Sequence, residues 1–207
     1  MTIFDLLFIL LFLASVVALI SILIMLVRGR VPAAKRLLLF FLGTWALYLA
    51  IVFITAAATP QTIIAFNQEQ CFDEMCFSVS QVQTATQLGP SSSPVSAKGV
   101  FYVVTVRVTS HSRGRAQSEG GIHALLWDSA RYYDISPSGQ RAWEATHATP
   151  RLTARLQPGE SILSDQVFDV PARSPSLSLV LSHGFTPAYI VIGECPLFHP
   201  PAILRLQ

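Results

Sequence analysis

The sequence predicts two transmembrane α-helices followed by an all-β sandwich, and three observations favour this fold class. Two long apolar runs without charged residues lie near the N-terminus. A short loop rich in Arg and Lys separates them. Beyond residue 73, apolar residues alternate in many short segments divided by turn-forming residues, a pattern typical of sandwiches and barrels.

The two apolar runs form a predicted hairpin over residues 1–59. Residues 6–27 and 37–68 carry no charged side chain, and each run exceeds the about 20 residues that cross a bilayer core. We expect helices at about residues 5–27 and 37–58. The preceding segment, MTIFD, has no positive charge, and the first run is longer than a signal-peptide core. A retained helix is therefore expected rather than a cleaved signal.

The topology follows from the loop between the helices, RGRVPAAKR, predicted at residues 28–36. Its basic residues are Arg28, Arg30, Lys35 and Arg36. Short loops dense in Arg and Lys are retained in the cytoplasm. We therefore expect a two-pass protein of the inner (plasma) membrane. Its N-terminus and C-terminal domain would lie outside the cytoplasm, in the periplasm of a Gram-negative host.

Trp45 and Tyr48 stand out in the second apolar run. Such aromatics favour the membrane interfaces, yet these two fall near the middle of the predicted helix, three residues apart and so on one face. They pack against the first helix, or they contact another protein or a large cofactor. Neither run contains an ionisable residue, which disfavours transporter and channel functions.

The outer part comprises a predicted connector, residues 60–73, and a predicted sandwich, residues 74–207. Its clearest strand is Val100–Ser110, where every second residue from Tyr102 to Val108 gives one wholly apolar face. A first strand is expected around Phe77 to Val82. The other expected strands are Ile122–Asp128, Tyr132–Ile135, Leu152–Leu156, Ile162–Val170, Leu177–Ser182, Tyr189–Ile192 and Ile203–Leu206.

Longer motifs in this part carry a family resemblance. The run LQPGESILSDQVFDVP, residues 156–171, combines a Pro-Gly-Glu turn with a strand ending Phe-x-Val-Pro. The Val-rich strand VFYVVTVRVTSHS precedes a hairpin, LLWDSARYYDIS. Over about residues 74–206 the chain resembles bacterial extracytoplasmic immunoglobulin-like domains of unknown function. The resemblance implies an immunoglobulin-like sandwich fused to the membrane hairpin, with Trp127 as a candidate core residue. Unlike an antibody domain, the chain has no Cys pair on the expected central strands and no Trp between such a pair.

The three cysteines allow one disulfide bond in an oxidising compartment. Cys71 and Cys76 are close in sequence and lie before or within the first strand. Cys76 with Cys195 is the rival pairing, since first and last strands of such sandwiches are often neighbours. We favour Cys71 with Cys76, leaving Cys195 as a free thiol.

Signals for catalysis or cofactor binding are thin. Cys195 and His199 resemble the ligand loop of blue-copper proteins, with His123 or His147 as a further ligand. No Met follows His199, however, and prolines crowd the loop. The pair Ser182 and His183 lacks a third catalytic partner. We expect no enzymatic activity and no cofactor.

Charge excludes one class of partner. Subtracting the four loop residues from 14 basic residues, and Asp5 from 12 acidic ones, leaves 10 basic and 11 acidic residues in positions 37–207. So neutral an outer part gives no case for nucleic-acid binding.

These features indicate a non-catalytic accessory or stabilising subunit of a larger bacterial membrane complex of respiratory, photosynthetic or secretory function. The expected partners are integral membrane subunits and the lipid bilayer. The alternatives are a membrane-tethered ligand-binding or envelope-sensing module, which would need a concave pocket with convergent polar groups, and a copper-binding protein. The candidate partner-contact residues are Trp45, Tyr48, Tyr132, Tyr133, Trp143 and Phe185.

Overall fold

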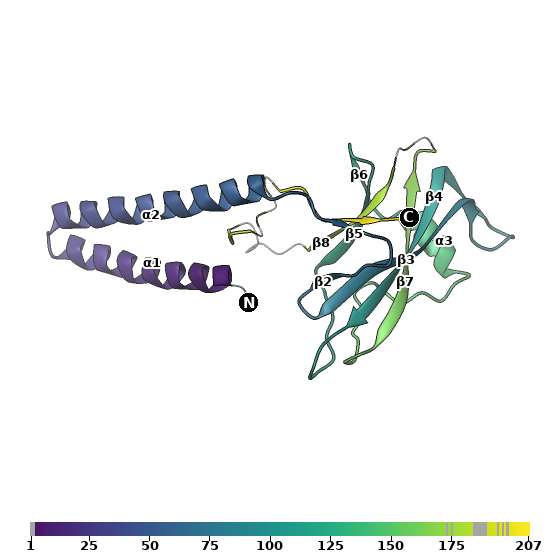
Figure 1. The fold of residues 1–207 in the computed structure, drawn as a ribbon, viewed down its shortest axis with the longest axis horizontal. Coiled ribbons are helices and arrows are strands. Elements are labelled where there is room, and N and C mark those ends of the chain that lie inside the picture. The colour runs from purple at the N-terminus through teal and green to yellow at the C-terminus, as the bar shows by residue number, and fades with distance from the viewer. Residues whose placement is uncertain are drawn as a thin grey trace. The chain divides into compact units, whose positions relative to one another are not determined.

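A computed structural model describes residues 3–172, 174, 176–183, 190–193, 195, 197 and 199–207. Two compact units make up the chain. One consists of Met1–Pro60 with Phe185–Pro200, and the other of Gln61–Gly184 with Pro201–Gln207. The first unit holds two long helices and the second holds the β-strands and a short helix (Figure 1).

The helices of the first unit are α1, Ile3–Val27, and α2, Val31–Ala58. Both are long and apolar enough to cross a membrane, by length and composition. The connection is shorter than the predicted loop because α2 begins at Val31, with a proline in its first turn. Proline suits this position, where its missing N–H is not needed. Lys35 and Arg36 therefore lie on the helix rather than in the loop.

The second unit is a β-sandwich of two sheets, as expected. One sheet has the strand order β1-β9-β8-β5-β6 and the other β2-β3-β4-β7. The strands are β1 (Ile63–Ile64), β2 (Gln70–Phe72), β3 (Met75–Leu88), β4 (Val95–Ser110), β5 (Ile122–Trp127), β6 (Tyr132–Tyr133), β7 (Ser161–Val170), β8 (Ser178–His183) and β9 (Ile203–Arg205). All neighbouring strands pair antiparallel except β1 and β9, which are parallel.

Two expected strands are not found. Leu152–Leu156 forms only an isolated bridge, between Leu156 and Gln117. Tyr189 of the expected strand Tyr189–Ile192 lies outside the described residues, and residues 190–192 form turns and bends. Neither segment has the run of alternating residues that β4 has.

The main core lies between the two sheets. Val104, Val106 and Val108 of β4 point into it, together with Phe168 of β7 and Leu126 of β5. Each of these five side chains is fully shielded from solvent, and full burial of such a side chain stabilises by about 1.5–3 kcal/mol. Because side chains alternate along a strand, this is the wholly apolar face predicted for β4.

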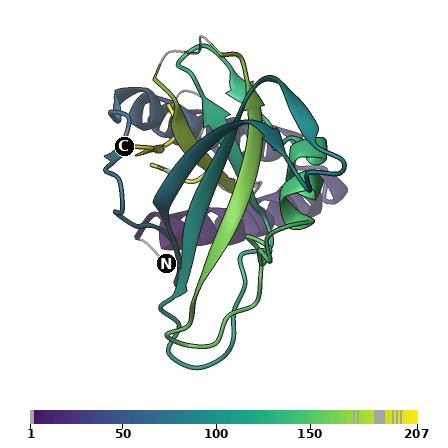
Figure 2. The same cartoon turned by 90° about the vertical axis from the view of Figure 1, so that its right-hand side faces the viewer.

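A second, smaller core covers the other face of β4 and was not predicted. Helix α3, Pro137–Glu144, packs on β4 and β7 (Figure 2). Ser136 caps its N-terminus by accepting a hydrogen bond from the N–H of Gly139. The residues buried in this core are Leu88, Phe101, Val103, Ala142, Trp143 and Val167. The segment Ser136-Pro-Ser-Gly starts this helix, since a serine N-cap followed by proline opens helices.

The close approach of α3 to the sheet generates a prediction. A Cβ at Gly139 would lie 2.8 Å from Cε1 of Phe101 and 2.9 Å from Cγ1 of Val167. We expect Gly139→Ala to destabilise the sandwich by about 1–3 kcal/mol through overpacking, although alanine favours helices by about 1 kcal/mol. Urea unfolding of the full chain in detergent measures the change.

The matched control is Gly120→Ala, because nothing lies within 4 Å of a Cβ built there. Its free energy of unfolding should stay near that of the wild type. An increase in stability for Gly139→Ala would mean that α3 does not pack closely on β4.

Candidate functional site

The polar side chains of the hairpin make contacts inside the first unit. Trp45 Nε1 donates to the Ser15 hydroxyl at 2.9 Å, and that hydroxyl donates to the Leu11 carbonyl at 2.8 Å. Trp45 also meets Tyr48 edge to face, with ring centroids 5.8 Å apart. Trp45 therefore links α2 to α1. This is the predicted alternative in which it packs against the first helix.

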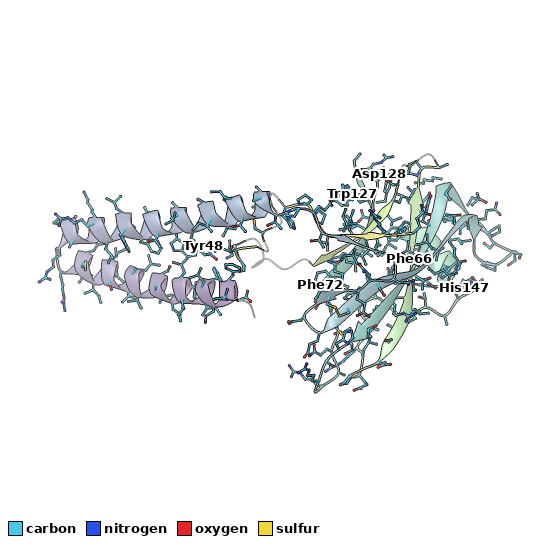
Figure 3. The ribbon with its side chains drawn as sticks, in the orientation of Figure 1. Tyr48, Phe66, Phe72, Trp127, Asp128 and His147 are labelled. Atoms are coloured by element: carbon cyan, nitrogen blue, oxygen red, sulfur yellow. A yellow bond between two sulfur atoms is a disulfide. The ribbon has the colours of Figure 1, made fainter. Side chains whose placement is uncertain are left out.

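Tyr48 contacts a segment that the sequence did not place near the helices. Its hydroxyl donates to the Ile190 carbonyl at 2.9 Å. Ile192 and Cys195 pack with Tyr48, which Figure 3 labels, in one buried cluster. The cluster also contains Val52 and Ala56, one and two turns further along α2. The chain after β8 thus returns to α2 before it enters β9.

Tyr48 leaves little surface for the predicted partner contact, because the residue is only 6% exposed. Its polar edge is occupied by Ile190, and its apolar ring by neighbours in the same unit. Outward-facing surfaces of α1 and α2 consist of large apolar side chains. The most exposed are Ile3, Val17, Leu23, Val27, Leu39, Phe40, Leu47 and Ile54.

The four basic residues of the predicted topology signal are all exposed. Arg28 and Arg30 lie in the turn between the helices, and Lys35 and Arg36 lie near the start of α2. They are gathered at one end of the hairpin because the helices meet there (Figure 1).

The aromatic residues predicted as contacts in the outer domain differ in exposure. Tyr132 is 49% exposed and stacks on Trp127, with centroids 6.3 Å apart. Tyr133 is partly buried. Trp143 is 9% exposed, donates to Oδ2 of Asp165 at 2.8 Å and stacks on His147. Trp143 belongs to the smaller core and leaves little surface for the predicted partner contact.

Phe185, the last of these predicted contacts, lies outside the described residues. Trp127, expected in the core, is only partly buried and does not belong to the main core cluster.

A carboxylate network fixes the turn between β5 and β6. Asp128 is 6% exposed. Its carboxylate accepts hydrogen bonds from the Tyr133 hydroxyl at 2.6 Å and from the N–H groups of Ala130 and Arg131 at 3.0 and 2.9 Å. The hydroxyl and these N–H groups lower the pKa of Asp128 from 3.8 to about 2 because they stabilise the ionised form.

The structure contains the favoured disulfide bond, Cys71–Cys76. These two residues face each other in the register of β2 and β3. The tight turn between the strands includes Asp73, which has φ of 54°. Cys195 is a free, fully buried thiol, so the rival Cys76–Cys195 pairing is wrong.

The described residues assemble no copper site. Their one group of three metal-ligand side chains within 4.8 Å is Glu69, Cys71 and Cys76, and its sulfur atoms form the disulfide. The ring Nδ1 of His199 lies 3.2 Å from the Thr59 carbonyl. His147 stacks on Trp143, and His123 is exposed.

Comparisons with known proteins add little. No protein-family model and no curated protein matches the chain. A conserved hypothetical protein from Bacillus anthracis has a TM-score of 0.48 at 16% identity, covering 59% of this chain and 92% of that one. The YjhA protein of Bacillus subtilis has a TM-score of 0.43 at 10% identity, and the match covers 70% of this chain and 99% of that one. The secreted protein MPT63 of Mycobacterium tuberculosis has a TM-score of 0.43 at 16% identity, and the match covers 62% of this chain and 93% of that one.

Each of these TM-scores lies below 0.5, so the description of the sandwich rests on its own strand order. The chain combines two long apolar helices, which fit a membrane anchor, with a β-sandwich. Its disulfide suggests an oxidising, extracytoplasmic compartment for the sandwich.

The Asp128 network predicts an acid-sensitive turn. Because the folded pKa lies below the unfolded one, ionised Asp128 stabilises the native state. That contribution is complete above about pH 4 and is lost as the pH falls towards 2. We expect Asp128→Asn to lower the Tm at pH 5, and to show a smaller further loss at pH 2 than the wild type. Thermal unfolding at both pH values measures the Tm of each protein. An equal fall in Tm from pH 5 to pH 2 for the two proteins would contradict the role given to Asp128.

The disulfide predicts a modest and local stabilisation. Closing so short a loop contributes about 2 kcal/mol in the chain-entropy account. We expect Cys71→Ala with Cys76→Ala to lower the free energy of unfolding by about that amount while the fold persists. Thiol labelling of the unfolded wild-type protein should find one thiol before reduction and three after it. With Cys195→Ala no thiol should react before reduction, and any other count would indicate a different pairing.

Proposed function

We propose that this protein is a non-catalytic accessory or stabilising subunit of a larger bacterial membrane complex of respiratory, photosynthetic or secretory function. In this proposal α1 and α2 cross the inner membrane and pack on other subunits. The sandwich braces the outer surface of the complex. The Arg- and Lys-rich end of the hairpin faces the cytoplasm, so the N-terminus and the sandwich lie outside it.

The proposal includes an immunoglobulin-like type for the sandwich, and the strand order supports it. Strands β3, β4 and β7 are adjacent in one sheet, and β9, β8 and β5 in the other. This order corresponds to A-B-E and G-F-C of an immunoglobulin domain. The parallel pairing of β1 with β9 brings the chain's entry and exit strands together at one sheet edge.

The contact of Ile190, Ile192 and Cys195 with α2 carries the proposal. Tyr48 lies ten residues before Ala58, the last residue of α2, which is about 15 Å at 1.5 Å per residue. In a helix that crosses a core of about 30 Å, Tyr48 is near mid-depth. The Ile190 carbonyl that it binds belongs to a segment with neither helix nor strand.

Irregular backbone at membrane depth is tolerated where protein buries it, and not where lipid surrounds it. Tyr48 satisfies one carbonyl from the α2 side. The lipid-facing side of the segment needs a cover that supplies further hydrogen bonds or excludes lipid. Neighbouring helices of a partner protein are the cover we propose, and the exposed apolar face of α2 around Leu47 and Ile54 offers them a matching surface.

Affinity purification from native membranes in mild detergent, followed by mass spectrometry, tests the proposal. We expect recovery of a stoichiometric complex with several membrane subunits. Tyr48→Phe leaves the Ile190 carbonyl without its donor and should reduce the yield of the partners. Tyr102→Phe, which removes the hydroxyl of a partly buried tyrosine on β4 that is not a predicted partner contact, serves as the matched control. Recovery of the wild-type protein alone would refute the proposal.

Photo-crosslinking locates the partner. A photoreactive residue at Leu47, which is 64% exposed on α2, should give a discrete crosslinked protein band in native membranes. The equally exposed Val17 on α1 shows whether the first helix shares the contact. The purified protein reconstituted alone in liposomes should give lipid adducts only. Lipid adducts from both positions in native membranes would argue for a simple anchor.

A further inference from the structure

The sandwich contains a cleft that the proposed function does not use. Its volume is about 1180 Å³, and all residues that line it belong to the sandwich unit. Strands of both sheets contribute, including β3 and β4 on one side and β8 and β9 on the other. The volume exceeds the about 300–1,000 Å³ of ordinary small-molecule sites.

Three aromatic side chains line the cleft: Phe66, Tyr102 and Trp127. All three are partly buried. Phe66 and Tyr102 also pack against the main core. Tyr132 stacks on Trp127 with an angle of 22° between the ring planes. Figure 3 labels Phe66 and Trp127.

Arg205 is the single charged side chain that lines the cleft among the described residues. It lies on β9 and is exposed. Within the described part of the chain, no carboxylate lies at ion-pair distance from its guanidinium. A guanidinium presents paired N–H donors that match a carboxylate, so the cleft favours an anionic ligand.

Ser174 adds an unsatisfied polar group. It lines the cleft, and its hydroxyl is buried without a hydrogen-bond partner among the described residues. Buried hydroxyls are almost always paired with protein or with ordered water. The Ser174 hydroxyl is therefore available to a ligand or to a bound water.

One residue of the cleft lining, and one residue next to the lining, have a positive φ. Ser129 lines the cleft with φ of 76°, and Asn67, with φ of 64°, follows Phe66. Asp128 holds the strained turn by accepting the next two N–H groups. Non-glycine residues in this conformation concentrate at ligand-binding sites.

We propose that the cleft binds an acidic oligosaccharide. The aromatic rings provide flat apolar surfaces for the C–H faces of sugar rings, and the Arg205 guanidinium pairs with a carboxylate of the saccharide. Uncharged polar residues make up nearly half of the lining, and most of them carry hydroxyl groups. The Ser80 hydroxyl already donates to the Thr105 carbonyl. A hydrocarbon chain would leave the buried Ser174 hydroxyl unpaired at a cost, whereas a saccharide supplies a partner for it.

Calorimetric titration of the full chain in lipid nanodiscs tests the proposal with three probes. These are a galacturonic acid tetrasaccharide, a neutral tetrasaccharide of the same length, and oleate. We expect the acidic saccharide to bind at least ten times more tightly than the neutral one. Preferential binding of oleate, or no binding of the acidic saccharide up to millimolar concentration, would overturn the proposal.

Two variants separate this site from general charge attraction. Arg205→Gln should weaken binding of the acidic saccharide at least tenfold, and Trp127→Ala should weaken both saccharides. Arg107→Gln removes another exposed arginine, on β4 and away from the cleft lining, and should leave binding unchanged. Circular dichroism confirms folding of each variant. Equal losses for Arg205→Gln and Arg107→Gln would overturn the assignment. The outcome is independent of membrane partners, because the probes and the chain are the only components besides lipid.

Discussion

Over residues 103–106 strand β4 is buried on both faces, and the sandwich is organised around this constraint. It pairs with β3 on one side and β7 on the other, so its backbone groups are satisfied along most of its length. Val104, Val106 and Val108 fill the core between the sheets. On the opposite face, Phe101 and Val103 require a second cover, which α3 provides with Trp143. Ser136 makes this packing possible by capping the start of α3, and Gly139 by leaving room for Phe101 and Val167.

A second constraint lies in the path of the chain. The polypeptide passes between the two units three times, at residues 60, 184 and 200. A domain attached by one linker would need a single passage. The returning segment brings Ile192 and Cys195 to α2, where apolar burial and the Tyr48 hydrogen bond hold them. The anchor unit is therefore built from the N-terminal helices and from a segment that lies in the sequence between β8 and β9 of the sandwich.

The two proposals use different surfaces and different physics. Packing of the hairpin on membrane partners depends on close apolar contact and on covering irregular backbone where water is absent. The cleft instead depends on a guanidinium, hydroxyl groups and aromatic faces that remain accessible to water. An accessory subunit that also holds an acidic envelope glycan would connect a membrane complex to the layer outside it.

The sequence by itself determined the two helices, the Cys71–Cys76 pairing that we favoured, and the strands with strict alternation. Their signals are local: uncharged length, short loop closure and side-chain period. It did not reveal α3, because Ser-Pro-Ser-Gly suits a turn as well as a helix start, and only the apolar outer face of β4 selects the helix. Likewise Tyr48, Trp143 and Arg205 acquire their roles from residues 22 or more positions away. Such contacts depend on which surfaces meet, and the tertiary structure alone decides this.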